Sequence, residues 1–178
     1  MSATTAASPA LLSEMKLNDG RRLVELSHKS PVLLVFLRHF GCTFCREAMQ
    51  ELSERREEIE QNGTELVLVH MSDRATADRY FNRYSLPGVL HISDPECRFY
   101  ADFGLTKGSM TQLFGLQSWI RGFQAGVIKG HGVGAQLGDG FQMPGVFVLK
   151  EGVVIDKFIH RLSSDRPDYI SLMNCCRT

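Results

Sequence analysis

The sequence predicts one α/β domain in which helices cover both faces of a mixed β-sheet. Three short apolar runs, at 32–37, 66–69 and 146–149, are rich in β-branched residues and do not alternate with polar ones. Such runs are typical of strands that are covered on both faces. A helical pattern separates the first two runs, and a strand–helix–strand unit predicts parallel pairing. A fourth run, at 153–159, follows the third after a short glycine-containing link, which predicts an antiparallel hairpin. The sheet should therefore be mixed and the domain three-layered.

The remaining elements are expected in order along the chain. In the first helix, Met49, Leu52 and Ile59 fall on one face, and Asn62-Gly63 supplies a stop signal. Arg22 to Leu26 is a candidate edge strand. Further helices are expected at 73–84, 94–103 and 165–173, with a short strand at 90–93.

The length of 178 residues fits a single domain with one large insertion. We expect residues 1–15 to be a disordered or loosely ordered lead and residues 16–178 to form the domain. The insertion is placed at 104–143, which is rich in glycine and lacks a strong strand pattern. Within it, 109–123 is a candidate helix and 130–140 a loop.

Composition excludes several classes of function. Twenty basic and twenty acidic side chains cancel, so no net field indicates nucleic acid or an anionic membrane as a partner. No apolar run approaches the roughly 20 residues that span a bilayer, and the first ten residues lack the features of a secretory signal. We expect a cytoplasmic protein. Five cysteines are an odd and sparse set for this length, which argues against a disulfide framework.

Cys42 and Cys45 form a C-x-x-C motif where the first strand passes into a helix. Two intervening residues make one helical turn, so both sulfurs can come together. The positive end of a helix stabilises a thiolate. Cysteines in C-x-x-C motifs generally have a lowered pKa. Arg38 and His39 add positive charge, whereas Glu47 on the acidic helix opposes the thiolate.

A metal site and inert structural thiols are the competing interpretations of this pair. Structural zinc normally takes four ligands, but Cys97 is solitary and Cys175-Cys176 are adjacent, an awkward spacing. These three cysteines are expected to be spectators, although Cys97 could also act as a distant resolving thiol. The glycine-rich stretch lacks G-K-[ST], which argues against a nucleotide. A redox pair that needs no metal or other cofactor is therefore favoured.

The segment around Cys42-Thr43-Phe44-Cys45 resembles a thioredoxin-fold active site. Between about residues 22 and 172, the chain is similar to the peroxiredoxin-like branch of the alkyl hydroperoxide reductase/thiol-specific antioxidant (AhpC/TSA) superfamily. The segments that carry this resemblance are 36–42, 94–105, 142–149 and 160–167. It implies a thioredoxin-like three-layer α/β/α sandwich.

The same resemblance implies further site residues. Met143-Pro144 occupies the place of the cis-proline loop, whose backbone faces the redox cysteines and binds the substrate. Arg161 is a candidate charge near the site, as are Arg38 and His39, and Thr43 lies inside the motif.

Two reaction classes remain open. In a thiol–disulfide oxidoreductase, Cys42 attacks a disulfide, Cys45 resolves the mixed disulfide, and a thioredoxin- or glutathione-type thiol restores the pair. In a thiol peroxidase, Cys45 attacks a hydroperoxide and Cys42 resolves. Typical peroxiredoxins carry T-x-x-C, and this chain has Cys42 in place of the threonine, which favours the first class. A redox sensor or binding module that uses 104–143 as its partner surface is a third hypothesis, and a homodimer remains open.

Overall fold

The computed structural model describes residues 7–109 and 138–177 of the protein. Its five-stranded sheet has the order β3-β2-β1-β4-β5. Strands β1 (Val32–Phe36), β2 (Glu65–His70) and β3 (Leu90–Ser93) are parallel, and β4 (Gly145–Lys150) and β5 (Val153–Ile159) form an antiparallel hairpin. The predicted mixed sheet, its parallel unit and its hairpin are confirmed.

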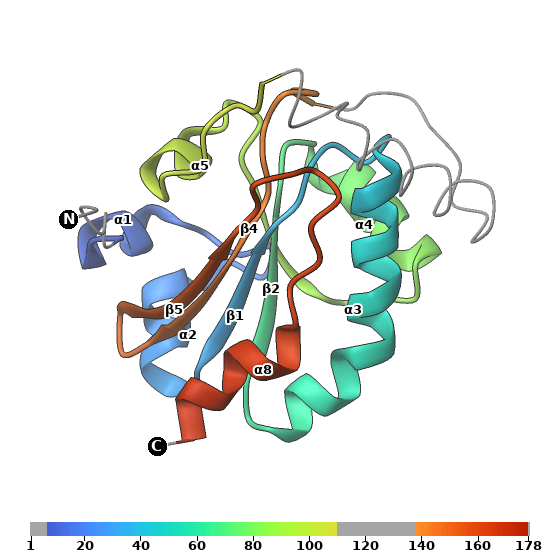
Figure 1. Ribbon diagram of the computed structural model, residues 1–178. Helices are drawn as coiled ribbons and strands as arrows, with labels where there is room; N and C mark the ends of the chain where they lie inside the picture. The colour runs from blue at the N-terminus through green and yellow to red at the C-terminus, as the bar shows by residue number, and fades with distance from the viewer. Residues whose placement is uncertain (1–6, 110–137, 178) are drawn as a thin grey trace.

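Helices cover the sheet on both faces (Figure 1). One face packs against α3 (Thr43–Gln61), α4 (Arg74–Arg83) and α8 (Tyr169–Met173). The other face packs against α1 (Pro9–Glu14), α2 (Leu23–Lys29) and α5 (Arg98–Asp102). A short 3-10 helix, η2 (Asn174–Arg177), follows α8. None of the described helices is long and apolar enough to cross a membrane.

Strand β1 lies at the centre of the sheet, and its composition explains why. Leu33 and Val35 face the layer of α3, whereas Leu34 and Phe36 face the layer of α1, α2 and α5. All five residues of the strand are buried. A continuous apolar run fits a strand that is covered on both sides, so the site that follows β1 is attached to a fully buried strand.

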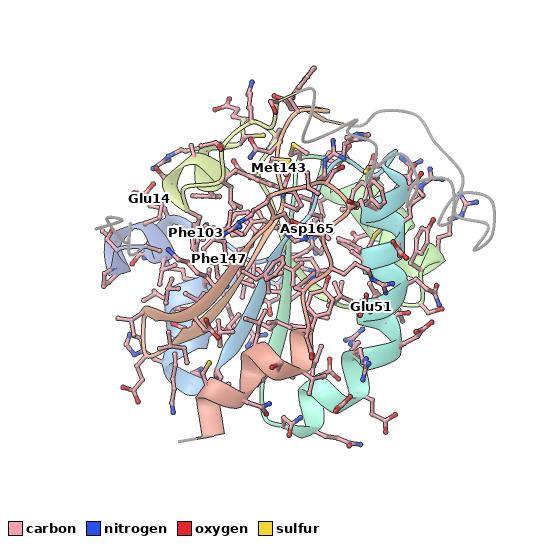
Figure 2. The ribbon with its side chains drawn as sticks, viewed as in Figure 1. Glu14, Glu51, Phe103, Met143, Phe147 and Asp165 are labelled. Atoms are coloured by element: carbon pink, nitrogen blue, oxygen red, sulfur yellow. The ribbon has the colours of Figure 1, made fainter. Side chains whose placement is uncertain are left out.

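An aromatic cluster fixes the end of β1. Phe36 packs against Tyr100, Phe103 and Phe147, with ring centroids 4.9, 4.9 and 5.6 Å away. Phe103 and Phe147 also contact each other (Figure 2). The Tyr100 hydroxyl, fully buried, lies 2.6 Å from the carbonyl oxygen of Leu37, the first residue after the strand. This contact holds the chain where it leaves the sheet.

Replacing Tyr100 by phenylalanine should lower the free energy of unfolding by about 1–3 kcal/mol, because the Leu37 carbonyl loses its donor in a dry environment. Urea denaturation of both proteins would measure the loss. A Tyr80→Phe variant is the control, since Tyr80 is only partly buried. Equal stability of the Tyr100 variant and the natural protein would show that the hydroxyl does not anchor this turn.

Residues 23–29 form helix α2, so the candidate edge strand at 22–26 is wrong. The Glu25 carboxylate accepts the backbone N–H of Arg22 at 3.3 Å and caps the first turn. Leu23 and Leu26, three positions apart, are both buried on one helical face. The segment contains a single β-branched residue, Val24, so its local preference for a strand is weak.

The N-terminal segment also differs from the expected loose lead. Ser8 caps α1, whose Leu12 is fully buried, and Met15 is buried directly after the helix. These side chains join the core on the α2 face. From Ala7 onwards the lead is therefore part of the packed domain.

Several predicted helices are present with later starts. The Asp94 side chain accepts the backbone N–H groups of Arg98, Phe99 and Tyr100, so α5 begins at Arg98. Asp168 caps α8 in the same manner. Helix α3 ends as predicted at Asn62-Gly63, where Gly63 has a φ of +73°. The candidate helix at 109–123 lies almost wholly outside the described residues, as does most of the loop at 130–140.

Candidate active site

Cys42 and Cys45 lie at the start of α3, where the sequence predicts them. Cys42 is the N-cap residue, and its backbone N–H donates to the His39 carbonyl at 2.9 Å. Both side chains are buried, with exposed fractions of 8% for Cys42 and 3% for Cys45, and both are free thiols. Phe40, two residues before Cys42, packs with its ring stacked on that of Tyr80 at a centroid distance of 4.6 Å.

Arg38 is the cation at this pair. Its Nη1 donates to Cys42 Sγ at 3.0 Å, and its Nε donates to the Gln142 carbonyl at 3.2 Å. Its Nη2 donates to the Gly140 carbonyl. Hydrogen bonds from a charged donor are stronger than neutral ones, and a buried guanidinium needs such partners. The arrangement places a charged hydrogen-bond donor directly at the Cys42 sulfur.

Cys45 has the opposite environment. Its thiol donates to the Arg38 carbonyl at 3.3 Å. Burial raises the pKa of the Cys45 thiol far above its usual value, the nearby Cys42 adds to the rise, and Arg38 and Arg46 oppose it. Cys45 is therefore protonated at neutral pH. Of the two sulfurs, one accepts a hydrogen bond from a cation and the other donates to a carbonyl.

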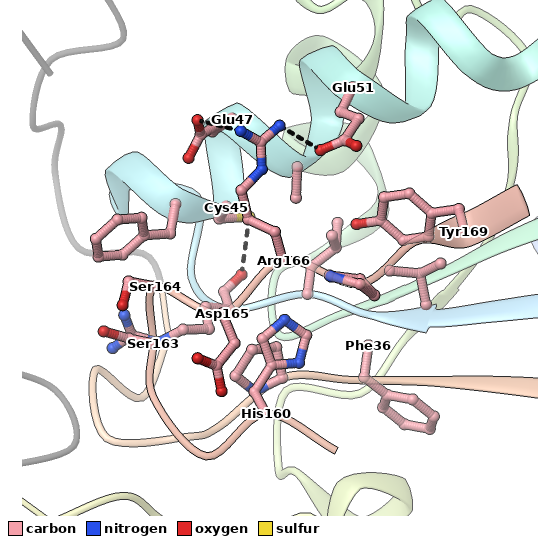
Figure 3. A pocket seen from close by; sticks show the side chains of 17 residues that line it. Phe36, Cys45, Glu47, Glu51, His160, Ser163, Ser164, Asp165, Arg166 and Tyr169 are labelled. Carbon is pink, nitrogen blue, oxygen red and sulfur yellow. Dashed lines mark hydrogen bonds and ion pairs between the residues drawn. The ribbon is translucent and has the colours of Figure 1, made fainter. Parts of the chain in front are cut away.

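The expected opposition from Glu47 is offset by an arginine that sequence reasoning did not place here. Arg166 Nη1 lies 3.4 Å from Glu47 Oε1, and its Nη2 lies 2.7 Å from Glu51 Oε2 (Figure 3). Glu47 is buried, so its charge needs a partner. Because the guanidinium supplies one, the acidic face of α3 acts on the thiols less than its sequence charge implies.

The other residues that the sequence places near the cysteine pair differ in burial and in their contacts. His39 is half-buried, and burial together with Arg38 and Arg46 lowers its pKa to about 4, so it adds no positive charge at pH 7. Thr43 is buried as the first residue of α3. Arg161 is exposed, and its backbone N–H donates to Asp165.

Met143-Pro144 lies just before β4, as predicted, but the implied cis bond is wrong. No peptide bond among the described residues is cis. For a bond before proline the trans form is favoured by about 0.5–1 kcal/mol. The Met143 N–H donates to the Thr106 carbonyl at 3.3 Å. Pro144 lines a cavity together with Cys45.

This cavity was missed from the sequence. Its volume is about 40 Å³, and it lies between the start of α3 and the loop that joins β5 to α8 (Figure 3). Cys45 lines it, whereas Cys42 does not. Polar lining residues from that loop and from α8 include His160, Ser163, Ser164, Asp165, Arg166 and Tyr169. No local sequence motif marks these residues, because they are far from Cys45 in the sequence and approach it only in the folded chain.

The other described cysteines lie apart from this cavity. Cys97, half-buried, is the N-cap of α5, and burial raises its pKa. Cys175 donates to the Leu172 carbonyl at 2.9 Å. Within 7–109 and 138–177, no group of three or more histidine, cysteine, aspartate or glutamate side chains is arranged to hold a metal ion.

Comparisons with known proteins identify the family. No curated protein matches the sequence. Among solved structures, peroxidoxin BcpB of Mycobacterium tuberculosis is similar with a TM-score of 0.59 at 18% identity, over 92% of this chain and 90% of that chain. A mutant of peroxiredoxin Q from Xanthomonas campestris gives 0.64 at 13% identity, over 96% and 94%. A yeast mitochondrial 1-Cys peroxiredoxin gives 0.61 at 9% identity, over 92% and 70%.

These likenesses confirm the thioredoxin-like α/β/α fold. A family model described as "AhpC/TSA antioxidant enzyme" matches residues 51–161, which is more than half of the chain. The matched segment begins on α3 after the cysteine pair, covers strands β2 to β5, and ends where the loop at the cavity begins. The chain therefore belongs to the AhpC/TSA antioxidant enzyme family.

Proposed function

We propose that this protein is a thiol–disulfide oxidoreductase in which Cys42 attacks and Cys45 resolves. The observation that carries the proposal is the opposite hydrogen bonding of the two sulfurs around Arg38: its guanidinium donates to Cys42, and its carbonyl accepts from Cys45. A thiolate is the nucleophile in disulfide exchange, and Arg38 favours it at Cys42.

The reaction runs in two exchanges. The Cys42 thiolate attacks one sulfur of a substrate disulfide, a mixed disulfide forms, and the other substrate sulfur leaves as a thiolate. Cys45 then loses its proton and attacks the Cys42 sulfur, the mixed disulfide breaks, and the second substrate thiolate leaves. Two electrons pass from the dithiol to the substrate, and no metal or other cofactor is required.

In this proposal the disulfide substrate binds beside the loop that precedes β4. Arg38 engages the Gly140 and Gln142 carbonyls, which places the loop before β4 beside Cys42. We assign Met143 and Pro144 the role of orienting the disulfide there. A thioredoxin- or glutathione-type thiol returns the pair to the reduced form, and the proposed setting is the cytoplasm, where such thiols are maintained.

Single serine variants test the assignment. With a disulfide substrate, Cys42→Ser should lose all activity, because the attacking sulfur is gone. Cys45→Ser should stop after one exchange and accumulate a mixed disulfide, which intact-protein mass spectrometry would detect on Cys42. A mixed disulfide trapped on Cys45 in the Cys42→Ser protein, with none trapped on Cys42, would overturn the order of attack.

Thiol peroxidase activity is the second candidate, and the cavity favours it. The cavity is lined by Cys45 and its volume of about 40 Å³ suits a very small molecule, and solved peroxiredoxins share the fold. In this alternative Cys45 attacks the peroxide and Cys42 resolves. Peroxide consumption that survives in Cys42→Ser and disappears in Cys45→Ser would establish it. A pair that cycles between dithiol and disulfide without turning over either substrate would favour the sensor hypothesis.

A further inference from the structure

The proposed reaction leaves one proton without a destination. Cys45 must become a thiolate before it can attack the mixed disulfide, yet it is 3% exposed and donates its hydrogen to the Arg38 carbonyl. A carbonyl oxygen cannot take that proton away. An acceptor within the protein would have to be close to Cys45.

The cavity beside Cys45 provides such a place. A water molecule occupies about 30 Å³ in the liquid and is held in a protein cavity when polar groups surround it. The cavity of about 40 Å³ accommodates one, and side chains of both signs surround it (Figure 3). The ionisable groups that line it are Cys45, Glu47, Glu51, His160, Asp165, Arg166 and Tyr169, and Arg38 also lines it.

Most of these groups are already engaged. Arg166 binds the carboxylates of both Glu47 and Glu51. Asp165 Oδ2 accepts the backbone N–H groups of Arg161 and Leu162, at 2.7 and 2.8 Å.

Tyr169 and His160 are the other two ionisable lining groups besides Cys45 and Arg38. Burial raises the pKa of the Tyr169 hydroxyl, so it stays protonated. His160 differs from all of them: its Nδ1 atom is buried and has no hydrogen-bond partner among the described residues.

We infer that His160, through a water molecule held in this cavity, accepts the proton of Cys45 when that thiol resolves the mixed disulfide. The inference rests on the proposed function. The proton moves from Cys45 Sγ to the water and from the water to Nδ1. The Cys45 thiolate then forms the bond to Cys42, and the departing substrate thiolate takes a proton as the imidazolium returns to neutral. His160 thus acts on Cys45 and does not touch the substrate.

The electrostatic surroundings suit this role. Burial, with a smaller contribution from Arg38, lowers the pKa of His160 to about 4, although Asp165 and the backbone of Pro144 and Asp165 favour the protonated ring. The ring is therefore neutral and able to accept a proton at pH 7. When Cys45 ionises, its new charge stabilises the imidazolium across the cavity, because a nearby opposite charge favours the protonated ring.

Stopped-flow reaction with dithiobis(nitrobenzoate) separates the two exchanges. Attack by Cys42 releases a first equivalent of the coloured nitrothiolate, and resolution by Cys45 releases a second. In His160→Gln the first phase should keep its rate, whereas the second should slow by roughly 100-fold, a usual contribution of general-base catalysis. His28→Gln is the matched control, since His28 is exposed and lies beside Gly152, away from the cavity.

The pH profile distinguishes proton transfer from a structural effect. With His160 as acceptor, the second phase of the natural protein should be nearly level between pH 5 and 8, where the ring is neutral. In His160→Gln the second phase should rise about tenfold per pH unit, because the thiol must then ionise without an internal base. His160→Asn should behave in the same way, and an unchanged first phase shows that each variant is folded.

Two results separate the inference from the proposed function. A natural protein that releases a single equivalent would overturn the dithiol reaction itself. Two equivalents, with an equal rate and an equal pH profile in His160→Gln, would leave the reaction standing and remove His160 from it.

Discussion

Replacing Arg38 by methionine should slow the reaction of Cys42 with iodoacetamide at pH 7 by about 10- to 150-fold. The range follows from the 1.5–3 kcal/mol that a hydrogen bond to a charged group contributes. Methionine keeps much of the buried volume but removes the donor that lies 3.0 Å from Cys42 Sγ. Alkylation rates followed by mass spectrometry would measure the effect at Cys42 itself.

Two companion variants make this result specific to Arg38. Arg38→Lys keeps a charge but cannot serve Cys42, Gly140 and Gln142 together, because an ammonium lacks the planar fork of a guanidinium, so an intermediate rate is expected. Arg55→Met removes an exposed cation from α3, the helix that Cys42 caps, and should leave the rate unchanged. A folded Arg38→Met protein that alkylates at the natural rate would show that the contact does not activate Cys42.

Acidification from pH 7 to pH 4 should lower the free energy of unfolding by a few kcal/mol, and a buried histidine pair accounts for much of this loss. His70 Nε2 lies 2.9 Å from His91 Nδ1, and His91 Nε2 lies 3.0 Å from Asp78 Oδ1. Both rings are buried. Burial lowers the pKa of His70 to about 3, with His91 adding to the shift, and burial also lowers the pKa of His91.

The direction follows from proton uptake. Below about pH 6.5 the unfolded chain protonates these histidines, whereas the folded protein keeps them neutral, so the unfolded state binds more protons and stability falls with pH. For His70 the loss begins near pH 6.5 and is complete near pH 3. Urea denaturation at a series of pH values would measure it. In His70→Gln the slope between pH 6.5 and 4 should be shallower, and an equal slope would assign the acid sensitivity to other groups.

The sheet could be predicted because each strand carries its own local signal. The run Val32–Phe36 is apolar throughout, and its central place between β2 and β4 follows from its burial on both faces. The segment at 22–26 failed for the converse reason: its hydrophobic pattern suits either element, and packing of Leu23 and Leu26 decides in favour of a helix. Local preference is a weak guide where tertiary contacts outweigh it.

The candidate site was likewise only partly predictable from the sequence. The position of Cys42 and Cys45 at the start of a helix follows from spacing within a few residues. The contacts that distinguish the two sulfurs do not, because they depend on where the chain returns. Gln142 is 104 positions from Arg38, and Arg166 is 115 positions from Glu51. No pattern in a single sequence marks such pairs, so the cavity and its lining became visible only in the structure.

The distance between Arg38 and Gln142 along the chain also has a consequence during translation. Strands β1, β2 and β3 and helix α3 all precede residue 94, so they can assemble while the ribosome is still adding the rest. At about 5–20 residues per second, the 104 positions from Arg38 to Gln142 take roughly 5–20 s to synthesise. Throughout that interval the nascent chain carries both thiols without the loop that later binds Arg38. The contacts of Arg38 with the Gly140 and Gln142 carbonyls can therefore form only after the cysteine pair is already made.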